Sequence, residues 1–82
     1  MSVRILVAED EALIRMDLVE MLQGAGYEVV AQATNGQEAI DLAIEHKPDL
    51  AILDVKMPIL DGISAAEKII EILKRGVLTL TF

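Results

Sequence analysis

The sequence predicts an α/β fold, in which a parallel β-sheet carries helices on its faces. Short apolar stretches rich in β-branched residues alternate with stretches whose apolar residues recur at helical spacing, in the order βαβαβαβ. The connections between them are short, which favours right-handed crossovers between parallel strands. The 82 residues allow one domain at most, and they contain no internal repeat or linker.

The first strand and helix are predicted from a change of period near residue 10. Residues 3–8 are apolar and rich in β-branched side chains, as in a buried strand. Residues 12–25 then show helical spacing, and glycines at 24 and 26 suit the end of a helix. The predicted apolar stripe of this helix consists of Ile14, Leu18, Met21, Leu22 and Ala25.

The second strand and helix follow the same plan. Residues 27–33 have the composition of a strand, and residues 37–46 that of a helix. Asn35, with Glu38 three residues later, is a variant of the capping box that opens a helix. Pro48 then predicts the end of this helix, because the residue before a proline is biased away from helical geometry.

The third strand is predicted at residues 49–54, which are apolar on both faces and end in the carboxylate of Asp54. Ser64 and Glu67 form a second capping box, which predicts that the third helix opens there. Residues 77–82 have the pattern of a fourth strand.

Composition limits the classes of protein that remain. The chain is 54% hydrophobic, which excludes a disordered tail, and it contains no cysteine. No apolar run approaches the roughly 20 residues of a membrane span, and the first residues lack a secretory signal. The net charge of −7 argues against nucleic acid binding by this segment. We therefore expect a soluble, cytoplasmic protein without direct contact to membrane or nucleic acid.

Carboxylates follow the ends of two predicted strands. Glu9 and Asp10 come directly after the first strand, and Asp54 ends the third. If these strands are neighbours, the three carboxylates converge where ligands bind in open parallel sheets. Such anions repel by about 1–4 kcal/mol per pair, so the cluster suits Mg²⁺, beside which a carboxylate can act as a nucleophile. The alternative is that Glu9, Asp10 and Glu11 only cap the next helix.

Several short motifs occur at fixed spacing along the chain. They are VAEDE at 7–11, NGQEA at 35–39, LDVKMP at 53–58, and Asp61 followed by Gly62. Together they resemble the receiver domains of two-component response regulators, over the whole chain. The resemblance implies a flavodoxin-like (CheY-like) doubly wound sheet. It also implies a phosphoacceptor module that takes a phosphoryl group from a sensor histidine kinase.

The resemblance assigns a role to each residue of the cluster. Asp54 matches the phosphoacceptor, and Glu9 and Asp10 match the acidic pair, with Asp10 as the direct Mg²⁺ ligand. Lys56 matches the position whose backbone carbonyl contacts the metal. The residues that match the loop shaping the site are Pro58 and Gly62.

Thr81 matches the hydroxyl residue that hydrogen-bonds the phosphoryl group in this family. Thr79 shares a face of the predicted strand with it, and the spacing from Asp54 favours Thr81. Another helix, a fifth strand carrying a phosphate-pairing lysine and a last helix complete the family pattern, and none of them follows Phe82. We therefore expect residues 1–82 to be a receiver fragment with impaired phosphorylation. We also expect a homo-oligomer formed through the exposed fourth strand.

The stretch EDEALIRMDLVEML resembles receivers joined to RNA-binding antitermination (ANTAR) output domains. Two other functions stay open. An aspartyl-nucleophile hydrolase would share the fold and the metal, but it requires a second acid where Lys56 stands. A receiver remnant could instead serve as a non-catalytic interaction module. A dinucleotide-binding fold is excluded, because acids rather than a glycine-rich turn follow the first strand.

Overall fold

The computed structural model describes residues 2–54, 56–57, 61–73 and 76–80, with the backbone alone for 72–73 and 76–80. Its elements follow the predicted order of alternating strands and helices. They are β1 (Arg4–Ala8), α1 (Ala12–Gly24), β2 (Glu28–Ala33), α2 (Gly36–His46), β3 (Leu50–Asp54), α3 (Gly62–Leu73) and β4 (Gly76–Leu80).

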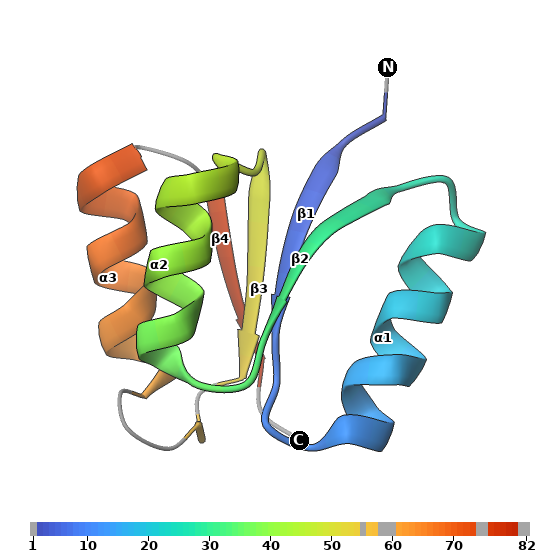
Figure 1. Cartoon of the computed structure of the whole chain (residues 1–82), viewed down its shortest axis with the longest axis horizontal. Coiled ribbons are helices and arrows are strands. Elements are labelled where there is room, and N and C mark those ends of the chain that lie inside the picture. Colours follow the sequence, from blue (N-terminus) through green and yellow to red (C-terminus); the bar gives the residue numbers. More distant parts are fainter. Residues whose placement is uncertain (1, 55, 58–60, 74–75, 81–82) are drawn as a thin grey trace.

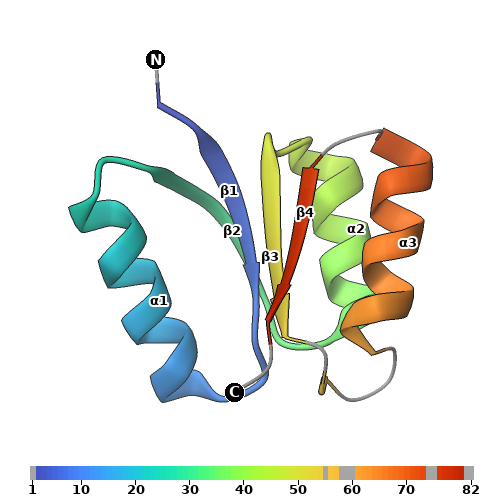
Figure 2. The same ribbon diagram turned by 180° about the vertical axis from the view of Figure 1, so that it is seen from behind.

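The strands form one parallel sheet in the order β2-β1-β3-β4. Helix α1 covers one face, and α2 and α3 lie side by side on the other (Figures 1 and 2). The chain passes from β1 outward to β2 and then returns to β3 on the opposite side of β1. The strand order therefore reverses between β1 and β3, which is the predicted doubly wound arrangement.

Side chains of the central strands alternate between two cores. In β1, Leu6 and Ala8 belong to the core under α2 and α3, whereas Ile5 and Val7 belong to the core under α1. The first of these cores is the larger and includes buried side chains from both helices. On the other face, Val19 is the buried residue of α1. Period-two alternation thus divides the side chains of the central strands between the two helical layers.

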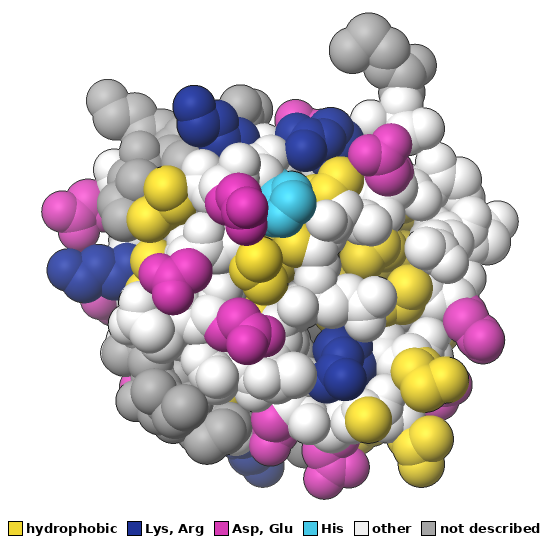
Figure 3. All heavy atoms as spheres, in the orientation of Figure 1, with side chains coloured by type: hydrophobic (Ala, Val, Ile, Leu, Met, Phe, Trp, Pro, Cys, Tyr) yellow, Lys and Arg dark blue, Asp and Glu magenta, His cyan; other side chains and the backbone are white. Residues whose placement is uncertain are grey.

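The predicted apolar stripe of α1 is partly wrong. Met21 is 68% exposed and Ala25 lies outside the helix, while Val19, which the stripe left out, is buried. Two residues along a helix turn through about 200°, so Met21 points away from the sheet when Val19 points into it. Leu13 and Met16 are exposed as well, and hydrophobic side chains gather over α1 in Figure 3.

The start of α3 also differs from the prediction. The helix begins at Gly62, not at Ser64, because Asp61 supplies the capping oxygen. Its Oδ1 accepts a hydrogen bond from the Ser64 backbone N–H at 2.8 Å, and this bond lowers the pKa of the Asp61 carboxyl. The Ser64 hydroxyl, predicted as the cap, donates to Asp61 Oδ2 at 3.2 Å instead.

Helix α2 begins at the predicted cap and ends in a strained residue. Asn35 Oδ1 accepts from the Glu38 N–H at 2.8 Å, and Glu38 Oε1 accepts from the Thr34 N–H at 2.9 Å. At the other end, Lys47 adopts a left-handed conformation with φ 48° and ψ 61°. This conformation is ordinary for glycine and unfavourable for a residue with a Cβ atom.

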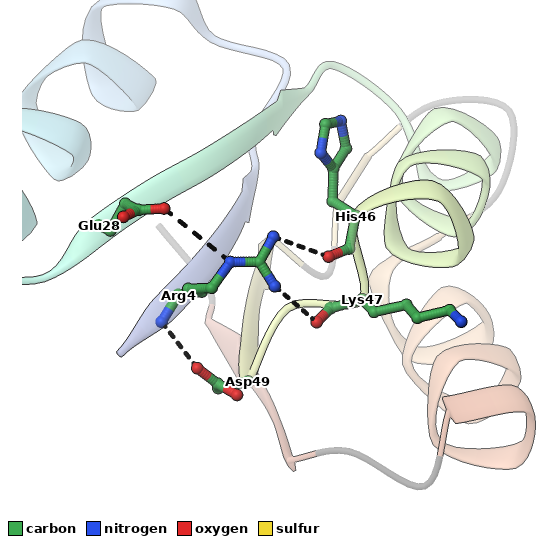
Figure 4. Close-up of polar contacts among 5 residues, drawn as sticks. All are labelled: Arg4, Glu28, His46, Lys47 and Asp49. Carbon is green, nitrogen blue, oxygen red and sulfur yellow. Dashed lines mark hydrogen bonds and ion pairs between the residues drawn. The ribbon is translucent and has the colours of Figure 1, made fainter. Parts of the chain in front are cut away.

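At the amino ends of the strands, Arg4 joins β1 to three neighbouring elements (Figure 4). Its guanidinium donates from Nη2 to the His46 carbonyl at 2.9 Å and from Nη1 to the Lys47 carbonyl at 3.1 Å. Its Nε lies 3.9 Å from Glu28 Oε2. The Arg4 backbone N–H donates to Asp49 Oδ2, and the Asp49 N–H donates to the Arg4 carbonyl. These contacts fasten α2, β2 and β3 to the start of β1.

Strand β4 pairs with β3 so that Leu80 lies opposite Asp54. The predicted strand at 77–82 is therefore confirmed as far as Leu80, and the last two residues lie outside the described part of the chain. Within that part, no helix has both the length and the hydrophobicity needed to cross a lipid bilayer.

Candidate functional site

The three predicted carboxylates meet at the carboxyl edge of the sheet. Glu9 and Asp10 follow β1 directly, and Asp54 is the last residue of β3. The two strands are neighbours, with Ala8 paired to Leu53. One carboxylate oxygen from each of the three acids lies within 4.8 Å of the others. The topology therefore builds a compact anionic cluster at the point where the strand order reverses.

The cluster lies at one side of an open pocket. Glu9 is only 1% exposed and Asp54 only 6%, whereas Asp10 is exposed. The pocket has a volume of about 220 Å³, and its remaining walls are formed by Glu11, Ile14 and Lys56. The pocket therefore meets solvent at the exposed Asp10, and the buried Glu9 and Asp54 form part of its wall.

Glu9 carries the strongest electrostatic perturbation of the site. Burial is the main cause that raises the pKa of its carboxyl from 4.5 to about 7, and the adjacent Asp54 carboxyl contributes to the same rise. The Glu11 N–H opposes this rise by donating to Glu9 Oε1 at 3.3 Å. Glu9 Oε2 is buried and has no hydrogen-bond partner among the described residues. Such an atom is costly unless a proton or a cation satisfies it.

Asp54 is oriented by the backbone of the following turn. The Lys56 N–H donates to Asp54 Oδ1 at 3.1 Å, which holds the carboxylate at the end of β3. The Lys56 side chain is exposed and lines the pocket. The predicted role of the Lys56 carbonyl as a metal contact stays a prediction.

The turn between β1 and α1 is held by contacts that the sequence does not reveal. The Glu9 N–H donates to the Ala33 carbonyl at 3.0 Å, and Arg15 Nη1 donates to the Glu9 carbonyl at 2.7 Å. Glu11 occupies the N-cap position of α1, but its side chain makes no capping hydrogen bond. The acidic run therefore does not cap this helix through Glu11. The contact of Arg15 with the Glu9 carbonyl was not predicted, because nothing in a sequence indicates which backbone group a polar helix residue will contact.

Two of the predicted site residues, Thr81 and Pro58, lie outside the described residues, and for Thr79 only the backbone is described. Gly62 is buried at the start of α3. The choice between Thr81 and Thr79 as the hydroxyl that meets a phosphoryl group stays a prediction.

Comparison with known proteins identifies the family. Residues 5–81 match the response regulator receiver domain. The chain is 67% identical over 66 residues to the transcriptional regulatory protein PdtaR of Mycobacterium tuberculosis, covering 80% of this chain and 32% of that protein. It is 43% identical over 72 residues to the chemotaxis protein CheY of Thermotoga maritima, covering 88% of this chain and 60% of that protein.

The solved structures agree with the sequence comparison. The response regulator domain of Thermotoga maritima CheB is similar with a TM-score of 0.94 and 35% identity, covering 99% of this chain and 61% of that chain. The present chain thus spans about a third of the length of PdtaR, and more than half of the receiver structure. It belongs to the response regulator receiver domain family, whose members are signalling modules.

Proposed function

We propose that Asp54 accepts a phosphoryl group from a phosphohistidine on a partner sensor kinase. The convergence of Glu9, Asp10 and Asp54 within 4.8 Å carries this proposal, because it combines a nucleophile with the ligands of a divalent cation. The family membership supports it. The residues proposed for metal binding are Glu9, Asp10, Asp54 and the Lys56 carbonyl.

The donor set of the site fits Mg²⁺. Magnesium binds carboxylate and carbonyl oxygens, and it keeps several of its waters. The exposed Asp10 is the candidate for direct contact, and the unpartnered Oε2 of Glu9 gives a buried oxygen that a cation or its water could satisfy. When bound, Mg²⁺ neutralises the cluster and the oxygens of the transferred phosphoryl group.

The transfer itself uses the carboxylate of Asp54. An Asp54 oxygen forms a bond to phosphorus while the bond between phosphorus and the donor imidazole nitrogen breaks. The electron pair of the broken bond stays on that nitrogen, which then takes up a proton. The Lys56 N–H holds the carboxylate during this exchange, and Thr81 is proposed to meet the phosphoryl group afterwards.

The surface beside the pocket supports a protein as phosphodonor. Ile14 lines the pocket, and the adjacent Leu13 on the same helix is 77% exposed. Exposed apolar side chains that adjoin a reactive site are typical of a docking surface. The name of the relative PdtaR supports a separate transcriptional output, for which an ANTAR domain is the candidate.

A hydrolase is less well supported. The position two residues after Asp54, where such an enzyme places a second acid, is Lys56, which lines the pocket. The interaction module retains one supporting observation, since β4 lies at an edge of the described sheet and an edge strand can pair with another chain. This edge is the proposed surface for a homo-oligomer, and light scattering coupled to gel filtration tests it. A monomer at tens of micromolar would refute the homo-oligomer.

The proposed extent of the domain rests on coverage. The chain spans 61% of the CheB receiver structure and 60% of CheY, so residues 1–82 correspond to part of a receiver domain. The proposed location is the cytoplasm, where sensor kinases present their phosphohistidine.

Phosphorylation of the 82-residue chain by acetyl phosphate tests whether Asp54 is the acceptor. With Mg²⁺, intact mass should show addition of one phosphoryl group, and Asp54→Asn should abolish it. Asp41→Asn is the matched control, because Asp41 is an exposed acid on α2 whose Oδ1 contact with Gln37 an asparagine can retain. Equal labelling of Asp54→Asn and the unchanged chain would exclude Asp54 as the acceptor. The same assay measures whether phosphorylation is impaired.

A further inference from the structure

The turn that carries the acidic pair depends on a side chain outside the pocket. Arg15 lies on α1 and is half-buried, and its Nη1 donates to the Glu9 backbone carbonyl at 2.7 Å. We infer that Arg15 is a positioning residue, which sets the orientation of Asp10 for Mg²⁺ through this carbonyl. The inference rests on the proposed metal-dependent function of the site.

The geometry of the peptide group makes this transmission direct. The Glu9 carbonyl and the Asp10 nitrogen and Cα atom share one plane, because the bond between carbon and nitrogen has partial double-bond character. The Glu9 N–H is already fixed to the Ala33 carbonyl at 3.0 Å. Once Arg15 also fixes the Glu9 carbonyl, the backbone of Glu9 is held on both sides, and the peptide plane that leads to the Asp10 Cα atom is set.

The rest of the turn offers little other support. Helix α1 begins without a side-chain cap, and its first turn contains no acidic residue. Within the turn, the Glu11 N–H reaches Glu9 Oε1 only at 3.3 Å. Val19 is the buried residue of α1, so the start of the helix is weakly anchored by packing. The Arg15 bond is therefore a principal link between the start of α1 and the end of β1.

Removal of Arg15 takes away both a positive charge and a hydrogen bond, and the two losses have opposite expected effects on Mg²⁺ affinity. The guanidinium forms no ion pair with the carboxylates of the described residues, so it is not neutralised by the cluster. A positive charge near the pocket would by itself repel Mg²⁺, and its removal would strengthen binding. A positioning role predicts that removal weakens binding. The sign of the change therefore distinguishes the two roles.

The test is an NMR titration of the full 82-residue chain with MgCl₂, monitored by backbone amide shifts. Arg15→Ala should bind Mg²⁺ roughly tenfold more weakly, as is typical when a supporting partner of a metal ligand is removed. Arg15→Lys keeps a donor and a charge and should recover part of the affinity. Arg4→Ala is the matched control, because Arg4 also donates to backbone carbonyls, at the opposite end of the sheet. It should lower thermal stability without changing the Mg²⁺ dissociation constant.

Amide hydrogen exchange without Mg²⁺ provides a second readout. In Arg15→Ala, the Glu9 and Glu11 amides, which donate to the Ala33 carbonyl and to Glu9 Oε1, should exchange several-fold faster, while the amides of β3 stay unchanged. Unchanged or tighter Mg²⁺ binding by Arg15→Ala would overturn the inference and leave the proposed function intact. A failure of the unchanged chain to bind Mg²⁺ would instead overturn the proposed function, and exchange at Glu9 and Glu11 would then decide whether Arg15 holds the turn.

Discussion

The two ends of the sheet differ in how their polar side chains are satisfied. At the amino ends of the strands, the Arg4 guanidinium is shared among two carbonyls and the Glu28 carboxylate (Figure 4). At the carboxyl ends, three carboxylates lie together, and Glu9 Oε2 is buried without a partner among the described residues. One end satisfies its polar groups internally, and the other requires a proton or a ligand.

This difference separates stabilising interactions from functional ones. A cation suits the end of α2, where the last carbonyls carry the negative end of the helix dipole. By contrast, the anionic cluster destabilises the fold that contains it, because burial and repulsion both disfavour the charged forms. Unfavourable arrangements such as this cluster of repelling carboxylates are expected at functional sites. The comparison therefore predicts that substitutions at the two ends change stability in opposite directions.

The largest expected effect is a pH dependence that originates at Glu9. Its pKa is raised from 4.5 to about 7, so the folded chain binds this proton more tightly than the unfolded chain. The resulting stabilisation is fully present below pH 4.5 and is lost as the pH rises to 7. Urea unfolding should show a loss of up to about 3 kcal/mol across this window.

Glu9→Gln should remove most of this dependence, because the neutral amide has nothing to ionise. The control is Glu67→Gln, since Glu67 is an exposed acid on α3 away from the cluster. A profile in which Glu9→Gln retains the full slope would show that other groups produce it.

Removal of the Arg4 guanidinium should have the next largest effect on stability. Arg4→Ala loses two hydrogen bonds to backbone carbonyls and the contact with Glu28, and it should destabilise the chain by about 1–2 kcal/mol. The exposure of this side chain limits the effect. Arg4→Lys should recover little, since an ammonium cannot reproduce the fork that reaches both carbonyls. If Arg4→Ala instead reduced phosphorylation of the folded chain at Asp54, the two ends of the sheet would not be separable.

Mg²⁺ should stabilise the fold by binding at the carboxylate end of the sheet. At a free concentration ten times the dissociation constant, it should increase the free energy of unfolding by about 1.4 kcal/mol at pH 8, where Glu9 is largely ionised. A chelator should reverse the gain. The gain should shrink at pH 5.5, because protons then compete for Glu9. Asp10→Asn tests the site, and an unchanged gain in this variant would place the cation elsewhere.

The reversal of strand order was predicted only through the resemblance to receiver domains. The residue pattern itself was sufficient to predict the order of elements and the three carboxylates. These depend on apolar periodicity and on acids that directly follow strands, and both are local patterns. The start of α3 was not predictable in the same way. Both Asp61 and Ser64 are good caps, and only the backbone geometry shows that Asp61 accepts the N–H.

The other features that the sequence did not predict are mostly contacts between residues far apart in the sequence. Nothing in the sequence indicates that Arg4 reaches carbonyls 42 and 43 residues away, or that Arg15 holds the Glu9 carbonyl. The exposure of Met21 was missed because a methionine fits an apolar stripe by composition, whereas the sheet contacts only a narrow part of α1. Side-chain to backbone bonds of this kind depend on the tertiary fold, so they follow from the coordinates and not from periodicity.

The smallest expected effect concerns Lys47, at the stabilising end of the sheet. Its φ of 48° is unfavourable for a residue with a Cβ atom, and its carbonyl is held by Arg4. Lys47→Gly should therefore increase the free energy of unfolding by up to about 1 kcal/mol relative to Lys47→Ala, which loses the same ammonium. The stability gain of Lys47→Gly should persist in the presence of Arg4→Ala, because the backbone conformation of residue 47 causes the strain and the Arg4 hydrogen bond does not. Equal stability of the glycine and alanine variants would show that Lys47 pays no conformational penalty there, and that Arg4 alone defines this end of the sheet.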